Sequence, residues 1–155
     1  MLRTMDRSVI ALVACGLLSA ATPSKAQDWL QAQRWEQRLV IVDAPLEAAL
    51  RPDLAASEAA LRERRMAVWG LDDGGLRWIG GSAPSAGASV DEAQLASLRQ
   101  ALEGAPARPG LHLFGLDGGL KASQSRADQL QELIDAVDSM PMRVREARGD
   151  TVQPQ

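Results

Sequence analysis

The chain has 155 residues and a net charge of −3, from 17 lysines and arginines against 20 aspartates and glutamates. This acidic balance, without any stripe of basic residues, excludes nucleic acid as the expected partner, because proteins that bind nucleic acid present clustered positive charge. The length is that of one domain, which is large enough to bury a hydrophobic core.

Residues 1–26 show the three-part pattern of a secretory signal peptide. Two arginines precede an apolar run over residues 9–21, and Ser24 and Ala26 stand where signal peptidase prefers small side chains. The run is shorter than the about 20 apolar residues of a membrane-spanning helix. We therefore expect cleavage after Ala26 and a mature chain of about 130 residues, located in the periplasm or secreted.

Cys15, the only cysteine, leaves a second outcome open at this N-terminus. The segment Leu12-Val13-Ala14-Cys15 is similar to a lipoprotein cleavage box, which would lipidate Cys15 and hold the protein on a membrane. The apolar run continues beyond Cys15, which favours the soluble form. Cleavage after Ala26 removes this cysteine, and the mature protein then lacks the thiolate that disulfide exchange and peroxide reduction at sulfur require.

The first half of the mature chain predicts a strand, a helix and two further strands. A polar lead-in segment over residues 27–37 precedes an apolar, β-branched strand at residues 38–43. A Pro-Asp pair suits the start of a helix over residues 52–64. An Asp-Asp-Gly-Gly turn then separates a strand at residues 66–71 from a short return strand at residues 76–79.

The middle of the chain predicts a loop and a second helix. Residues 80–88 are rich in small side chains and are typical of a flexible loop. Ser89 and Glu92 have the spacing of a capping box, which indicates a helix start. We expect this helix to end at Gly104, because glycine is favoured just after a helix.

The last part predicts a β-hairpin followed by a helix. A strand at residues 111–116, a tight Asp-Gly-Gly turn and a return strand at residues 120–122 form the hairpin. The helix begins near Ser125, and Pro141 is expected to stop it. The polar tail over residues 144–155 has no apolar face, so we expect it to be disordered.

The order β-α-β-(β)-α-β-β-α predicts a single α/β domain over residues 38–143. Crossovers through helices make the first strands parallel, and the hairpin makes the sheet mixed, with helices on both faces. This outline is compatible with thioredoxin-like folds, and other small α/β folds share it. The side chains expected in the core are Leu39, Ile41, Val68, Leu95, Leu98, Leu113, Leu130, Leu133, Ile134 and Val137.

Three segments together resemble a known family. They are residues 38–42 with the Ala-Pro pair that follows, the hairpin Gly115-Leu116-Asp117-Gly118-Gly119-Leu120-Lys121, and Ile134-Asp135 leading into Met140-Pro141-Met142-Arg143. The combination is similar to a family of bacterial exported proteins named only as a domain of unknown function. That family is described as peroxiredoxin-like with a thioredoxin-like fold, and the domain also occurs in vertebrate secreted sushi-repeat and coiled-coil-domain proteins.

The resemblance covers about residues 38–143 and implies no catalytic residues. Leu116 stands where the family often has a basic residue, and Arg65 stands where an acidic residue is expected, and both departures weaken any carry-over of the family's charged binding surface to this chain. The resemblance also implies a candidate cis-proline, Pro109, just before the strand that leads into the hairpin. An ordinary loop proline remains the alternative, since only about 5% of X–Pro bonds are cis.

His112 is the only histidine of the sequence, and its two candidate functional roles are metal ligand and catalytic base. A zinc site needs several nitrogen or sulfur ligands, and a Ser-His-Asp hydrolase of the common type has a Gly-x-Ser-x-Gly motif, which is absent. The pattern therefore favours a packed histidine. The two Asp-Gly turns lack the residue series of calcium and phosphate loops, and we expect neither a metal nor another cofactor.

Met140-Pro141-Met142-Arg143 is the most unusual segment and has two interpretations. The methionines can pack at the end of the last helix and serve the core, which the pattern favours. The segment can also form a partner-binding corner, with Arg143 as an anchor for a carboxylate or phosphate. The candidate binding residues are then Asp117, Lys121 and Arg143.

The sequence thus favours a non-enzymatic binding or interaction module of the cell envelope on a thioredoxin-like scaffold without sulfur. The expected partner is an envelope protein or a small ligand, with no membrane contact unless Cys15 is lipidated. The alternative is a small hydrolase or isomerase that uses carboxylates and His112. That alternative is weaker because a single histidine is the only side chain with a pKa suited to general base catalysis near neutral pH.

The signal peptide gives a direct prediction for the mature N-terminus. Because Ser24 and Ala26 fit the cleavage site, intact-mass analysis of protein from the envelope fraction should show a chain that begins at Gln27. A mass that corresponds to a diacylglyceryl-modified Cys15 at the N-terminus would instead establish the lipoprotein.

Overall fold

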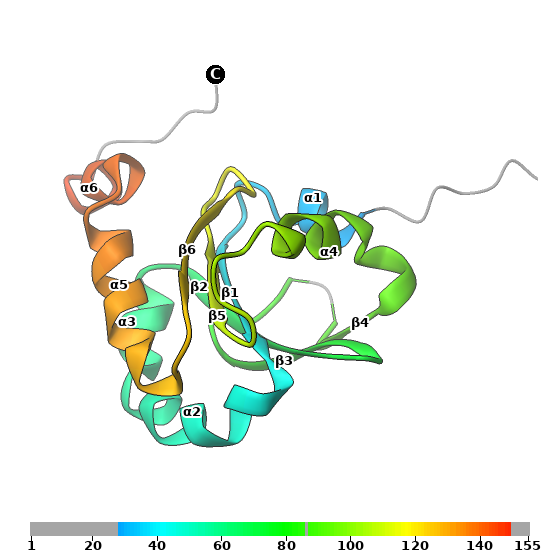
Figure 1. Ribbon diagram of the computed structural model, residues 1–155. Helices are drawn as coiled ribbons and strands as arrows, with labels where there is room; N and C mark the ends of the chain where they lie inside the picture. Colours follow the sequence, from blue (N-terminus) through cyan, green and yellow to red (C-terminus); the bar gives the residue numbers. More distant parts are fainter. Residues whose placement is uncertain (1–27, 86, 150–155) are drawn as a thin grey trace, which may run out of the picture.

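The structure, a computed structural model, describes residues 28–85 and 87–149. The predicted signal peptide, Cys15 and residues 150–155 of the predicted tail lie outside this part of the chain. Figure 1 shows a twisted sheet near the centre of the molecule with helices on both of its faces.

Within the described residues the sheet has six strands, in the order β4-β3-β2-β1-β5-β6. β1 and β2 are parallel, and every other pair of neighbouring strands is antiparallel. The strands are β1 (Arg38–Asp43), β2 (Met66–Asp72), β3 (Gly75–Gly81), β4 (Ser89–Asp91), β5 (Leu111–Phe114) and β6 (Leu120–Gln124).

The helices form two layers around this sheet. They are α1 (Trp29–Ala32), α2 (Ala44–Ala56), α3 (Glu58–Glu63), α4 (Ala96–Glu103), α5 (Leu130–Asp138) and α6 (Pro141–Ala147), with short 3-10 helices η1 (Glu92–Gln94) and η2 (Ala127–Gln129) before α4 and α5. Helices α2, α3 and α5 pack on one face of the sheet, and α1 and α4 pack on the other.

β1 lies inside the sheet and is buried on both faces, which explains its continuous apolar sequence. Successive side chains of a strand point to opposite faces. Val40 and Val42 therefore join the core under α2, α3 and α5, whereas Leu39 and Ile41 join the core under α1 and α4. All ten residues that the sequence placed in the core are buried, which confirms the periodicities from which they were predicted.

The predicted fold class is confirmed. The strands and helices follow the expected order around a mixed sheet, consistent with a thioredoxin-like α/β fold. The peptide bond between Arg108 and Pro109 is cis, as the resemblance implied for Pro109. Residues 111–124 form the expected hairpin, although β5 ends at Phe114.

The predicted start of the first long helix at Pro52 is wrong. α2 already begins at Ala44, with a proline in its first turn, and it contains Pro52. Proline inside a helix removes one backbone hydrogen bond. Here Leu50 and Leu54, on either side of it, are both buried in the core, and this packing holds the helix together across the proline.

The predicted capping box at Ser89 is also wrong. Ser89 and Val90 belong to β4, which pairs with β3, and α4 begins only at Ala96. Pairing with β3 and burial of Val90 between the sheet and α4 replace the local bonds of a cap. Glu92 instead forms an ion pair with Arg99, with its Oε2 at 2.7 Å from Nη2.

Two segments outside the predicted domain are also folded. Within the predicted lead-in, α1 buries Trp29, whose ring meets that of Trp69 edge-on with centroids 5.1 Å apart. At the other end Pro141 begins α6, so residues 144–147 are helical and not disordered as predicted. Proline stops α5 but suits the first position of the helix that follows, because that position needs no N–H donor.

The burial of Leu133 predicts the stability of the α5 layer. Leu133→Ala removes a fully buried side chain and leaves a cavity, so we expect the free energy of unfolding to fall by about 2–5 kcal/mol. Chemical denaturation measures this loss. Glu132→Ala, an exposed position in the same helix, is the control and should change it by no more than about 0.5 kcal/mol; equal effects would contradict the packing of α5.

Candidate functional site

A groove of about 280 Å³ lies between the β5–β6 turn and the junction of α5 and α6. Two of the three predicted binding residues, Asp117 and Lys121, line it, and their side chains form an ion pair with Nζ and Oδ2 2.5 Å apart. Asp117 also accepts a hydrogen bond from the backbone N–H of Gly119, which shapes the tight turn. The remaining lining residues are Arg38, Gly115, Leu116, Met140, Pro141 and Met142.

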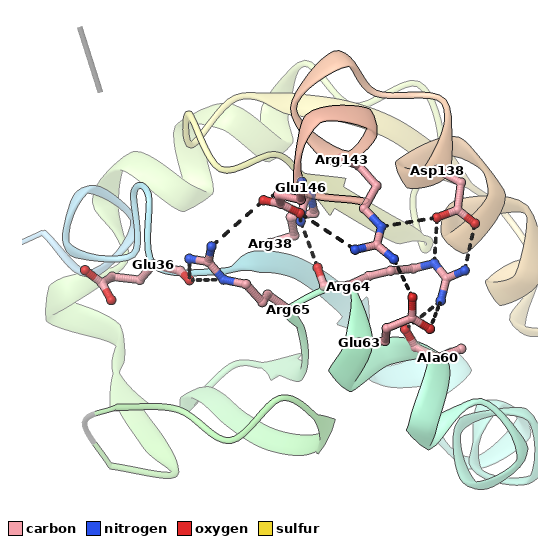
Figure 2. Close-up of polar contacts among 9 residues, drawn as sticks. All are labelled: Glu36, Arg38, Ala60, Glu63, Arg64, Arg65, Asp138, Arg143 and Glu146. Atoms are coloured by element: carbon pink, nitrogen blue, oxygen red, sulfur yellow. Dashed lines mark hydrogen bonds and ion pairs between the residues drawn. The ribbon is translucent and has the colours of Figure 1, made fainter. Parts of the chain in front are cut away.

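The structure does not bring Arg143 into this groove. Figure 2 shows its guanidinium pointing toward α3, where Nη2 lies 2.5 Å from the Glu63 carboxylate. Nε lies 3.6 Å from Asp138, and only 12% of the side chain is exposed. Asp138 also takes two bonds of 2.8 Å from Arg64, which hold the pKa of this carboxyl below its ordinary value. Arg143 therefore ties α6 to α3 and α5.

Arg38 completes this arginine–carboxylate network from the start of β1. It is 1% exposed, and its Nη1 donates to the Arg64 carbonyl at 2.8 Å and to Glu146 at 3.2 Å. Nη2 lies 3.4 Å from the same carboxylate, so a buried cation of the sheet is neutralised by α6 (Figure 2). Such a cation is tolerated inside a protein only with a partner of opposite charge. The wall of the groove that α6 provides is thus fixed by charge pairs.

A second, polar cleft of about 540 Å³ lies at the opposite end of β1. Asp43, the last residue of that strand, is buried and accepts hydrogen bonds from the Gly110 N–H at 2.9 Å and from Arg108 Nη2 at 3.0 Å. Burial raises the pKa of Asp43, but the bonds from His112 and Gly110 and the charge of Arg108 outweigh burial and hold this pKa below its ordinary value.

His112 links Asp43 to the neighbouring edge strand. One ring nitrogen, Nε2, lies 3.2 Å from Asp43 Oδ2, and the other, Nδ1, lies 3.0 Å from Ser123 Oγ on β6. The imidazole is fully buried, both nitrogens are engaged, and Ser123 does not line the polar cleft. His112 is therefore a packed histidine, in agreement with the interpretation that the sequence favours.

Sequence reasoning missed the polar cleft. Its lining residues are Asp43, Ala44, Pro45, Leu71, Asp72, Asp73, Arg99, Arg108 and Pro109, and they come from four separate segments. One signal was available in the sequence. An aspartate that directly follows a run of four apolar strand residues is expected to be partly buried, and a buried carboxylate needs hydrogen-bond donors. The donors at Arg108 and Gly110 follow from the tertiary fold and have no local pattern.

Residues 28–85 and 87–149 contain no group of three or more His, Cys, Asp and Glu side chains placed to hold a metal ion. None of the described helices has the length and apolarity needed to cross a bilayer.

Together, the fold and the two cavities define an α/β domain of thioredoxin-like topology whose described residues include no cysteine. A family model described as "Domain of unknown function (DUF4174)" matches residues 29–146, and the chain belongs to this family. Comparison with curated proteins and with solved structures gives no significant match.

The contacts of Asp43 predict both the size and the pH dependence of its contribution to stability. Asp43→Asn removes the charge that Arg108 and His112 face, so we expect a loss of about 1–3 kcal/mol in the free energy of unfolding at pH 7. Because the pKa of Asp43 is lowered in the folded state, its charge stabilises the fold above the unfolded-state pKa of about 3.9. The difference between wild type and variant should shrink as the pH falls through the lower, folded-state pKa.

Denaturant unfolding at a series of pH values measures this difference. Asp91→Asn is the matched control, because Asp91 is exposed and lies outside the polar cleft. Its effect should be small at every pH. A deficit of Asp43→Asn that stays constant down to pH values well below about 3 would contradict a charged Asp43 in the folded protein.

Proposed function

We propose that the protein is an exported, non-redox, peroxiredoxin-like binding module of the cell envelope. In this proposal the groove between the β5–β6 turn and α6 receives an apolar side chain from an extended segment of a partner protein. The observation that carries the proposal is the groove itself, where an apolar wall at Met140–Met142 faces Leu116 beside a charged pair.

The size and composition of the groove favour a protein segment over a larger small molecule. Its volume of about 280 Å³ is just below the range of ordinary ligand pockets, which measure about 300–1,000 Å³. Methionine side chains are flexible and adapt to varied apolar partners. The Asp117–Lys121 pair supplies the polar rim that surrounds the apolar centre of most protein interfaces.

We include Trp35 in the proposed binding surface. It is the large hydrophobic side chain that the described residues expose, at 44%, and its backbone N–H donates to the carbonyl of the groove residue Leu116 at 2.7 Å. Its φ of 68° is unusual for a bulky residue. Arg65 holds this conformation by donating to the Trp35 carbonyl at 2.9 Å. Tryptophan is enriched among the residues that dominate binding energy in interfaces.

The non-redox part of the proposal rests on sulfur chemistry. The only cysteine of the sequence is Cys15, within the predicted signal peptide. Hydrolase or isomerase chemistry is disfavoured because His112, the only histidine of the sequence, is buried with both ring nitrogens engaged and does not line the polar cleft.

Photo-cross-linking tests the proposed groove. With a photoreactive amino acid in place of Met142, we expect the protein to cross-link one envelope protein in intact cells. For that purified partner, Met142→Glu and Trp35→Ala should each raise Kd at least tenfold, or about 1.4 kcal/mol, because they place a charge in the apolar groove and remove the exposed aromatic ring.

Arg51→Ala is the matched control, because Arg51 is exposed and lies outside the groove, and it should leave Kd unchanged. Arg143→Ala is unsuitable as a binding variant, since Arg143 holds α6 in place. Unchanged affinity in both Met142→Glu and Trp35→Ala would reject this groove as the binding surface.

A further inference from the structure

The polar cleft at the end of β1 is lined by both acidic and basic side chains. β2 and β5 are the neighbours of β1 in the sheet. Asp72 ends β2 and Asp73 begins the turn into β3, whereas Arg108 precedes β5, so Asp72 and Asp73 flank Asp43 on one side and Arg108 flanks it on the other. Arg99 reaches the side of the cleft that carries Asp72 and Asp73 from α4, and its Nη2 donates to the Asp72 carbonyl at 2.9 Å.

Both arginines are held along one edge of the guanidinium. Arg108 donates through Nε and Nη2 to Asp43, and Arg99 donates through Nε and Nη2 to Glu92 at 2.9 and 2.7 Å. In each case Nη1 has no hydrogen-bond partner among the residues that the structure describes. The side chains are 40% and 31% exposed, so each guanidinium is fixed and still has donors for a ligand.

The remaining charge of the cleft is acidic. Asp43 and Glu92 neutralise the two arginines, and no ion pair among the described residues joins Asp72 or Asp73 to a basic side chain. Asp72 accepts a hydrogen bond from the Gly74 N–H at 2.8 Å. The pKa of the Arg99 guanidinium is raised, mainly by its hydrogen bond to Glu92. The negative charge of Asp73 contributes to the same increase. A ligand with only a negative charge would be repelled by the excess of carboxylates, and a ligand with only a positive charge would be repelled by the two guanidinium groups.

We propose that this cleft binds a zwitterion of the size of a short peptide with free termini. The carboxylate of the ligand pairs with the Nη1 side of Arg108, and its ammonium group lies at Asp72 and Asp73. The cleft volume of about 540 Å³ is within the range of small-molecule sites. This proposal concerns the opposite end of β1 from the groove, so it stands independently of the proposed function.

Isothermal titration with Ala-Ala, N-acetyl-Ala-Ala and Ala-Ala-amide tests the zwitterion. We expect Ala-Ala to bind, and each blocked peptide, which lacks one of the two charges, to bind at least tenfold more weakly. Asp73→Asn should weaken Ala-Ala at least tenfold while leaving N-acetyl-Ala-Ala unchanged, because that peptide has no ammonium group. Arg108→Lys should weaken Ala-Ala and, by a similar factor, N-acetyl-Ala-Ala, but not Ala-Ala-amide.

The control is Glu103→Gln, an exposed acidic residue of α4 that does not line the cleft. It should leave all three affinities unchanged, although it removes the same charge as Asp73→Asn. The proposal is overturned if the blocked peptides bind as well as Ala-Ala, if Asp73→Asn has no more effect than the control, or if Ala-Ala shows no binding up to about 10 mM.

Discussion

β1 begins with a buried cation, Arg38, and ends with a buried anion, Asp43. Both charges depend on partners from distant parts of the chain. Four apolar residues between Arg38 and Asp43 are buried on both faces of the sheet. Neither charge is stable at such a position without partners. Arg38 obtains Glu146 from the C-terminal helix, and Asp43 obtains Arg108, Gly110 and His112 from the segment around the cis-proline.

These partners place the two candidate sites at opposite ends of one strand. The groove is bounded by the helix that carries Glu146, and the polar cleft is bounded by the loop that carries Arg108. The groove is lined by methionines and a leucine beside one charged pair, whereas the cleft is lined mainly by charged groups. The two ends thus suit different chemical classes of ligand.

The sequence predicts the layers of the fold because burial patterns are local. The stripe from Leu130 to Val137 and the run from Leu39 to Val42 specify their helix and strand with no knowledge of the partners. Long-range contacts override local signals where the predictions are wrong. Pro52 remains helical because its neighbours are buried, and Ser89 pairs with β3 instead of capping a helix. For the candidate sites, Asp117 and Lys121 were found from the hairpin motif, but the partners of Asp43 come from segments more than 60 residues away.

The contact between Arg38 and Glu146 also bears on where this domain ends. None of the residues of α6 is buried, so hydrophobic packing alone gives little reason for the chain to extend beyond α5. The match to the family model nevertheless continues to residue 146, the position of the carboxylate that Arg38 requires. Electrostatic neutralisation of the central strand thus gives the folding unit a physical reason to include α6. A relative in which position 38 is apolar is free to end its domain one helix earlier.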